Sequence, residues 1–303
     1  MDVHVSIAAE TLFHIGPLPV TNSFLMMLIV MAALILVGAH IARTAKLMPG
    51  RLQASFEILV DFLLEIVDGT AGRAAGRKIF PLIGGIFIFI AFANYLGVFP
   101  GVGTIGYYET EPATAEEHAA APGDEIAAVG AAAAQAAPAK AESGERVLVP
   151  FVRSPNADLN MTVAMALVSF VAFQWLGIRQ HGVGGRLKHL ANPPLLFPIE
   201  IISELGRIIS LSARLFGNVF AGEILLTVMY AMVAAIKVAV IPLAIPVVFI
   251  GLELLFGTIQ ALVFALLSLV YIVLATEGGH DDEHAAAHAS APAAPQPQAH
   301  GAD

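Results

Sequence analysis

Residues 198–226 read PIEIISELGRIISLSARLFGNVFAGEILL, and this stretch decides the fold class. It is long and apolar enough for a membrane-spanning helix, which needs about 20 predominantly apolar residues, yet its interior carries charges. Glu200, Arg207 and Arg214 are spaced by seven residues, which keeps them within about 20° per step of one helix face. Intramembrane charges are costly and usually face a protein interior or a water-filled path. The stretch therefore predicts an integral membrane protein that moves ions across the bilayer.

The composition of the whole chain supports a membrane class. Of 303 residues, 57% are hydrophobic and 13% are charged, against about 25% charged residues in soluble domains. The formal net charge of −9 comes mostly from two alanine-rich polar segments, so it indicates no basic partner, and we expect no binding of nucleic acid. Cysteine is absent, which excludes disulfides, thiolate nucleophiles and cysteine metal sites.

Five segments have the length and composition of membrane spans. They run over 22–42, 79–99, 159–178, 205–236 and 240–275. The last two exceed the minimum length and carry polar residues, which predicts a long, tilted antiparallel hairpin. The stretches 52–68 and 195–204 are amphipathic, and we expect them to lie along the membrane interface. The predicted fold class is all-α integral membrane, with five spanning helices and an interfacial amphipathic helix.

Basic residues near the span ends indicate the orientation. They are concentrated between spans one and two and between spans three and four, whereas acids dominate between spans two and three. The first two connections are therefore predicted to be cytoplasmic, and the N-terminal segment 1–21 to be external. That segment has no Lys or Arg, so it lacks the basic start of a secretory signal.

The membrane domain is expected to cover 22–276, with an external low-complexity loop at 109–145. That loop is rich in Ala, Glu and Pro, and the cytoplasmic tail 277–303 is rich in Ala, His and Pro. Neither has the apolar periodicity of a core, so both are predicted to be disordered. His280, His284 and His288 have the spacing of a metal site on a helix, but the Gly, Ala and Pro around them favour a disordered tail. We expect neither a metal nor a cofactor.

Arg214 is the most informative charge in the chain. A guanidinium stays protonated even when it is buried, so Arg214 cannot itself carry protons. It can hold a nearby carboxylate ionised and block a direct ion leak. No acid lies three or four residues from it, which makes a structural ion pair the weaker alternative, whereas Arg207 lies near the expected cytoplasmic end and fits either interpretation. Small or polar residues fall near the same face, namely Ser203, Ser210, Asn218 and Ala221.

Polar residues on the last two spans can be matched in height. Glu223 lies nine residues after Arg214, about 180° around an ideal helix, so it should line a different cavity. Glu253 and Gln260 share a stripe of the fifth span. If the two spans form an antiparallel hairpin, one register pairs Arg214 with Gln260 and Glu223 with Glu253. Two close carboxyls in a low dielectric cannot both ionise cheaply, so such a pair can exchange protons. The alternative is that Glu253 only makes structural hydrogen bonds.

At these residues the sequence resembles a known family. SLSARLFGNVFAGE at 210–223 resembles the signature of subunit a of F-type ATP synthases, and GTIQALVFALLSLVYI at 257–272 resembles that family's final helix. NYLGVFPG at 94–101 and PIEIIS at 198–203 support the match, which covers about 20 to 276. The family often has a histidine where this chain has Glu223 or Glu253.

The resemblance implies a stator beside a rotating ring of c subunits, with two proton half-channels and a role in ATP synthesis. Arg214 matches the essential arginine that keeps the half-channels apart. The polar half-channel positions correspond to Asn218, Glu223, Glu253, Gln260 and, toward the cytoplasm, Glu200. The implied partners are the c ring, the b subunits of the peripheral stalk, the rest of the ATP synthase and membrane lipid. The implied location is the bacterial inner membrane.

Two other classes of function compete with the stator. A self-contained proton-coupled transporter would use Glu223 and Glu253 as a relay and would enclose a substrate cavity. A structural scaffold would leave the matched polar pairs unexplained. No phosphate-binding loop of the GxxxxGK[ST] type is present, so ATP chemistry is expected in other subunits and no independent active site in this one. The lack of a dense cluster of oxygen ligands favours protons over sodium.

Overall fold

The structure is a computed structural model, and it describes residues 9–16, 18–99, 101–103, 105–110, 146–190, 197–235 and 241–277. Five helices are long and apolar enough to cross a membrane. They lie within α1 (Asn22–Thr44), α3 (Arg73–Gly97), α5 (Leu159–Leu190), α6 (Phe197–Ala235) and α7 (Ile241–Glu277). This confirms the predicted fold class. The predicted loop at 109–145, apart from its first two residues, and the tail after 277 lie outside the described residues.

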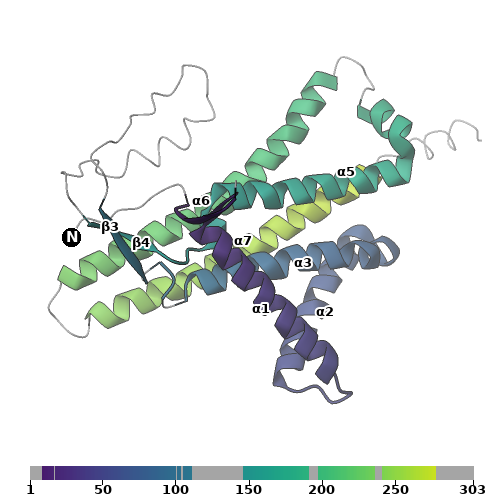
Figure 1. Cartoon of the computed structure of the whole chain (residues 1–303). Helices are drawn as coiled ribbons and strands as arrows, with labels where there is room; N and C mark the ends of the chain where they lie inside the picture. The colour runs from purple at the N-terminus through teal and green to yellow at the C-terminus, as the bar shows by residue number, and fades with distance from the viewer. Residues whose placement is uncertain are drawn as a thin grey trace, which may run out of the picture.

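A sixth helix, α2 (Arg51–Ala71), confirms the predicted amphipathic segment. It packs against α3 in the lower part of Figure 1. Leu63 and Val67 are buried in this contact, whereas Ile58 and Phe62 on its other side are exposed. A helix with one packed and one exposed apolar side suits the membrane interface, where its location stays a prediction.

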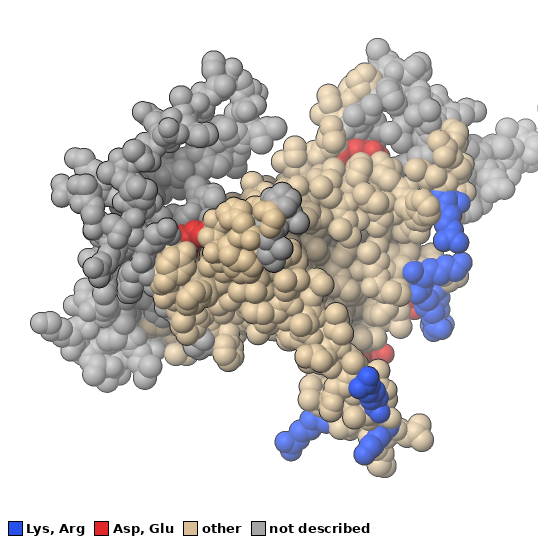
Figure 2. Space-filling model, in the orientation of Figure 1, with Lys and Arg blue, Asp and Glu red and all other residues tan. Residues whose placement is uncertain are grey.

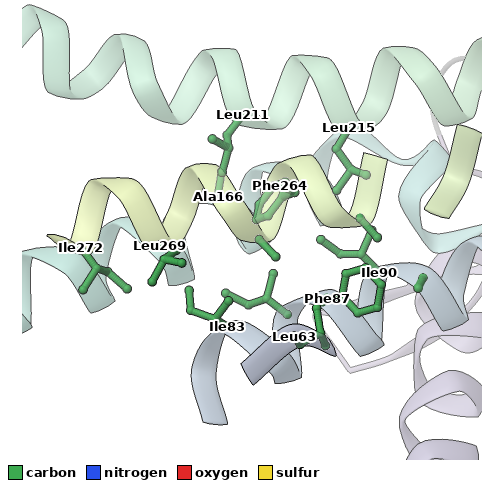
Figure 3. Packing of buried hydrophobic residues seen from close by; sticks show 14 of the residues in the cluster. Leu63, Ile83, Phe87, Ile90, Ala166, Leu211, Leu215, Phe264, Leu269 and Ile272 are labelled. Atoms are coloured by element: carbon green, nitrogen blue, oxygen red, sulfur yellow. The ribbon is translucent and has the colours of Figure 1, made fainter. Parts of the chain in front are cut away.

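The packed core lies between α2, α3, α5, α6 and α7. Figure 3 shows Leu211 and Leu215 of α6 directed toward α7, with Ile83, Phe87 and Ile90 of α3 on the other side of Phe264. Leu215, Ile90 and Leu269 are fully buried. This core fixes which side of α6 faces inward and which faces away from the protein.

The helices α6 and α7 form the predicted hairpin. Asn218 Nδ2 donates to the carbonyl oxygen of Phe256 at 3.4 Å, and a methyl group added at Gly222 would overlap the carboxyl of Glu253. Both contacts fit an antiparallel arrangement in the register expected for Glu223 with Glu253. Arg214 and Gln260 are therefore at the same height along the hairpin.

Two short β-hairpins accompany the helices. One pairs β1 (Thr11–Ile15) with β2 (Leu18–Thr21), and the other pairs β3 (Gly106–Thr110) with β4 (Arg146–Pro150). The second hairpin leads into the short helix η1 (Pro155–Ala157), which contacts α1, α3, α5 and α6. These elements were not predicted from the sequence. They matter because the segment from β4 to η1 enters the helix bundle.

The basic residues mark one end of the bundle. Figure 2 shows Lys and Arg side chains along the right and lower edges of the molecule, with a broad uncharged surface between them and the opposite end. These edges carry the C-terminal end of α1 and the N-terminal end of α3 (Figure 1). The exposed basic residues from the end of α1 to the start of α2, at the start of α3 and in the C-terminal half of α5 are Arg43, Lys46, Arg51, Arg73, Arg77, Lys78 and Arg179. The two connections predicted to be cytoplasmic thus begin on the same side of the structure.

Candidate functional site: a polar stripe on α6 and a buried ion pair

Arg214 lies on the outward side of α6. Its side chain is exposed, whereas Leu211 and Leu215 beside it are buried in the core. Within the part of the chain that the structure describes, its guanidinium makes no hydrogen bond or ion pair. A permanent cation at membrane depth is costly without a counter-charge or water. The position therefore requires a carboxylate or water supplied from outside this part of the chain.

The surface around Arg214 is lined with small side chains. Those that are exposed on α6 are Ser203, Gly206, Ser210, Ala213, Gly217 and Ala221, and we refer to them together with Arg214 as the α6 stripe. Small side chains let another helix approach closely, which is how helices associate inside membranes. Lipid requires no such surface, so the α6 stripe is suited to a helical partner.

Gln260 lies behind this surface at the height of Arg214. Its side chain is 7% exposed, and its Nε2 has no hydrogen-bond partner among the residues described. A buried amide donor without a protein partner is normally satisfied by water. Asn218, one turn from Arg214, is half-buried and bonds the backbone of α7. Polar groups therefore extend inward from the α6 stripe.

Glu223 lies on the opposite side of α6, as the helical geometry predicts, and it has a partner that the sequence analysis missed. Its carboxylate forms an ion pair with Arg153, with Nε to Oε1 and Nε to Oε2 distances of 2.9 Å and 3.1 Å. A third bond joins Nη2 and Oε2 at 3.1 Å. Arg153 is 4% exposed, and its guanidinium also lies over the ring of Phe220, 5.8 Å from the centroid.

Glu253 of α7 lies at the height of this ion pair along the α6–α7 hairpin, but its contacts are different. Its carboxyl packs over the backbone of Gly222, so only glycine at 222 leaves room for it. It is half-buried, and no hydrogen bond or ion pair joins it to any residue that the structure describes. The two glutamates are therefore close along the hairpin yet have unlike surroundings.

A chain of amides connects the segment from β4 to η1 with α3 and α7. Asn156 Nδ2 donates to Asn94 Oδ1 at 2.7 Å, and Asn94 Nδ2 donates to the carbonyl of Gly257 at 3.0 Å. All these groups are buried. One helical turn of α7 separates Gly257 from Glu253, so this amide chain and the ion pair together make this half of the bundle polar inside.

The other half of α6 carries a second set of polar contacts. Arg207 places its guanidinium over the ring of Tyr271, 5.1 Å from the centroid, and is half-buried. It therefore packs against α7 and does not share the outward setting of Arg214. Glu204 is 6% exposed and accepts a 2.5 Å hydrogen bond from Gln174 of α5. The backbone of Glu200 lies in α6, but its side chain lies outside the described atoms.

Three residues with polar contacts inside the bundle were not predicted from the sequence, namely Arg153, Glu204 and Asn156. Arg153 lies in the acidic connection between spans two and three, and nothing in its spacing reveals that this segment folds inward. No sequence pattern indicates the buried contact of Asn156 either. Glu204 was detectable, because it lies four residues after Glu200 in the same apolar stretch.

Comparison with known proteins decides the family. The family model described as ATP synthase A chain matches residues 24–273. The chain belongs to this family. Relatives named ATP synthase subunit a include one from Syntrophobacter fumaroxidans, 32% identical over 83% of each chain. Another, from Gloeobacter violaceus, is 31% identical over 92% of this chain and 94% of its own.

A third relative, named ATP synthase subunit a 1, is from Hahella chejuensis and is 30% identical over 86% of each chain. The match to the ATP synthase A chain family covers residues 24–273 and so includes both the α6 stripe and Arg153. It reaches into all five helices that could span a membrane and includes the segment from β4 to η1.

Proposed function

We propose that this chain is the stator subunit of the membrane sector of an F-type ATP synthase, which provides two half-channels for protons and an arginine that separates them. Membership of the ATP synthase A chain family supports the coarse part of this proposal, a multi-pass inner-membrane component of that complex. The finer part rests on one observation. Arg214 is exposed on a stripe of small residues without a counter-charge in the part of the chain that is described.

An outward-facing cation needs an anionic partner inside the bilayer. A ring of c subunits with one carboxyl each would supply it, and the small residues of the α6 stripe would let each ring helix approach. A ring carboxylate stays ionised while it lies opposite Arg214. It must take up a proton before it moves into lipid, because a charge there is costly. Arg214 then blocks the direct route between the two proton paths by charge, without moving.

The polar interior supplies the two paths. The outer half-channel would use the region of Glu223, Glu253 and the Asn94–Asn156 amides, and Asn218 and Gln260 would hold water between it and the ring. The inner half-channel would begin near Glu200. The basic ends of α1 and α3 support a cytoplasmic location for that side, which puts the N-terminus outside and the C-terminus in the cytoplasm. The b subunits of the peripheral stalk would hold the chain against ring rotation.

A self-contained transporter explains this geometry less well. Such a protein needs its charged group to face an internal substrate cavity, whereas Arg214 faces outward. The α6 stripe can act in proton transfer only when a partner helix lies beside it. We therefore propose the stator alone.

The test is ATP-driven proton pumping by the whole complex in inverted membrane vesicles. Arg214→Ala should abolish pumping while the amount of the subunit in the membrane stays normal. Arg179→Ala, which removes an exposed arginine at the end of α5, is the matched control and should pump normally. Normal pumping by Arg214→Ala in a fully assembled complex would overturn the proposal.

A further inference from the structure

We propose that Arg153 is a positioning residue of the outer proton path, which clamps Glu223 as a fixed carboxylate and leaves Glu253 as the group that carries the proton. This inference rests on the proposed function, because it assigns roles within that path. It differs from the expectation that the two glutamates act together as an equivalent pair.

The segment from β4 to η1, residues 146–157, is held in place at several points, and within this proposal we call it the outer segment. Asn22 Nδ2 of α1 donates to the carbonyl of Pro150, and the amide of Gly103 donates to the carbonyl of Val152 at 2.9 Å. Asn156 is bonded to Asn94 of α3. Arg153 therefore enters the bundle from a segment that is fixed on both sides, and its guanidinium has a defined position.

The geometry of the ion pair favours a Glu223 that stays ionised. Both carboxylate oxygens of Glu223 accept bonds from the guanidinium, and the side chain of Arg153 is 5% exposed while that of Glu223 is 27% exposed. A hydrogen bond between charged groups is roughly twice as strong as a neutral one, and here several act together. Protonation of Glu223 would weaken its bonds to a buried guanidinium, which is unfavourable. A carboxylate held in this way is a poor proton carrier.

Glu253 differs from Glu223 in its surroundings. Its carboxyl lies against the backbone of Gly222 and forms no ion pair with any of the residues that are described. It is half-buried and lies seven residues from Gln260, on the same side of α7. A proton from water can convert this carboxylate to the acid, and its transfer to a ring carboxylate restores the Glu253 carboxylate. No other reactant is needed.

The two carboxylates then have separate tasks. The guanidinium of Arg153 offsets the charge of Glu223, so Glu253 can lose its proton beside it without facing an uncompensated second carboxylate. Without Arg153, the two acids would compete for one proton. The arginine thus acts on the proton path through Glu223 and does not touch the proton itself.

The experiment measures ATP-driven pumping by the whole complex in inverted vesicles, normalised to the amount of this subunit in the membrane. Glu253→Gln should lose pumping at least about tenfold. Arg153→Gln should also lose pumping, because it leaves Glu223 unpaired, whereas Arg153→Gln combined with Glu223→Gln should pump several times faster than Arg153→Gln alone. Arg146→Gln, an arginine of the same outer segment in β4, is the control and should pump normally.

Two further variants separate positioning from a general effect on folding. Arg153→Lys keeps the charge and should retain more pumping than Arg153→Gln, and Arg153→Glu combined with Glu223→Arg should restore pumping relative to Arg153→Glu alone. A double glutamine variant no faster than Arg153→Gln would overturn the inference, as would Glu253→Gln that pumps normally. Either result leaves the proposed function standing if Arg214→Ala still abolishes pumping, so the two failures are distinguishable.

Discussion

Replacement of Gly222 by alanine should damage the proton path and leave the fold intact. A methyl group at this position would overlap the carboxyl carbon and both oxygens of Glu253. The carboxyl is the free end of a flexible side chain, so it should move aside and cost about 0.5–1.5 kcal/mol in rotamer strain. Alanine stabilises a helix interior over glycine by roughly 0.5–1 kcal/mol. The two effects nearly cancel, so the subunit should assemble in normal amounts.

Function should respond much more strongly than stability. A reacting group that is misplaced by about 1 Å can lose roughly 100-fold in rate, so ATP-driven pumping by Gly222→Ala should fall by one to two orders of magnitude. Dye quenching in inverted vesicles measures this rate. Gly85→Ala is the matched control, because Gly85 lies inside helix α3 and a methyl group there meets nothing within 4 Å.

A double variant tests whether overlap with the Glu253 carboxyl causes the loss of pumping. Aspartate at 253 shortens the side chain by one carbon–carbon bond, about 1.5 Å, and so makes room for the methyl group. Gly222→Ala combined with Glu253→Asp should therefore pump faster than Gly222→Ala alone. Pumping by Gly222→Ala at the rate of Gly85→Ala would refute the placement of the Glu253 carboxyl over Gly222.

Two other substitutions should act on stability, measured as the thermal unfolding of the purified complex in detergent. Asn94→Ala removes the bonds to Asn156 and Gly257 and should destabilise the subunit by about 1–3 kcal/mol; an unchanged midpoint would show that water replaces the amide. Gly182→Ala should cost about 1–3 kcal/mol, because φ is 69° and ψ is 166° there, a conformation open almost only to glycine. Gly184→Ala, where a methyl group meets nothing within 4 Å, is its control and should be neutral or slightly stabilising.

The spans and the hairpin could be predicted from the sequence because each rests on a local pattern. An apolar run of sufficient length forms a helix in a bilayer wherever it occurs, since every backbone group must be bonded within the segment. The register of α6 against α7 followed from matching polar residues along two neighbouring helices. Asn218 and Phe256 are joined in this register.

The partners of individual charges could not be predicted in the same way. Arg153 reaches Glu223 only because the segment before α5 folds back between helices, and irregular segments carry no periodicity that reveals their path. Arg207 shared a predicted face with Arg214, but each step of seven residues turns the face by about 20°. The long side chain of Arg207 covers the remaining distance to the ring of Tyr271. The spacing of residues in the sequence reveals neither long-range contacts nor how far a side chain extends.

The placement of the α6 stripe against a ring helix can be measured most directly by disulfide cross-linking. The chain has no cysteine, so Ser210→Cys gives a single reactive site one turn from Arg214. The account predicts a cross-link between this site and a cysteine placed beside the carboxyl of the ring subunit. Leu36→Cys, on an exposed position of α1, should give none. A cross-link from Leu36→Cys and none from Ser210→Cys would contradict the account.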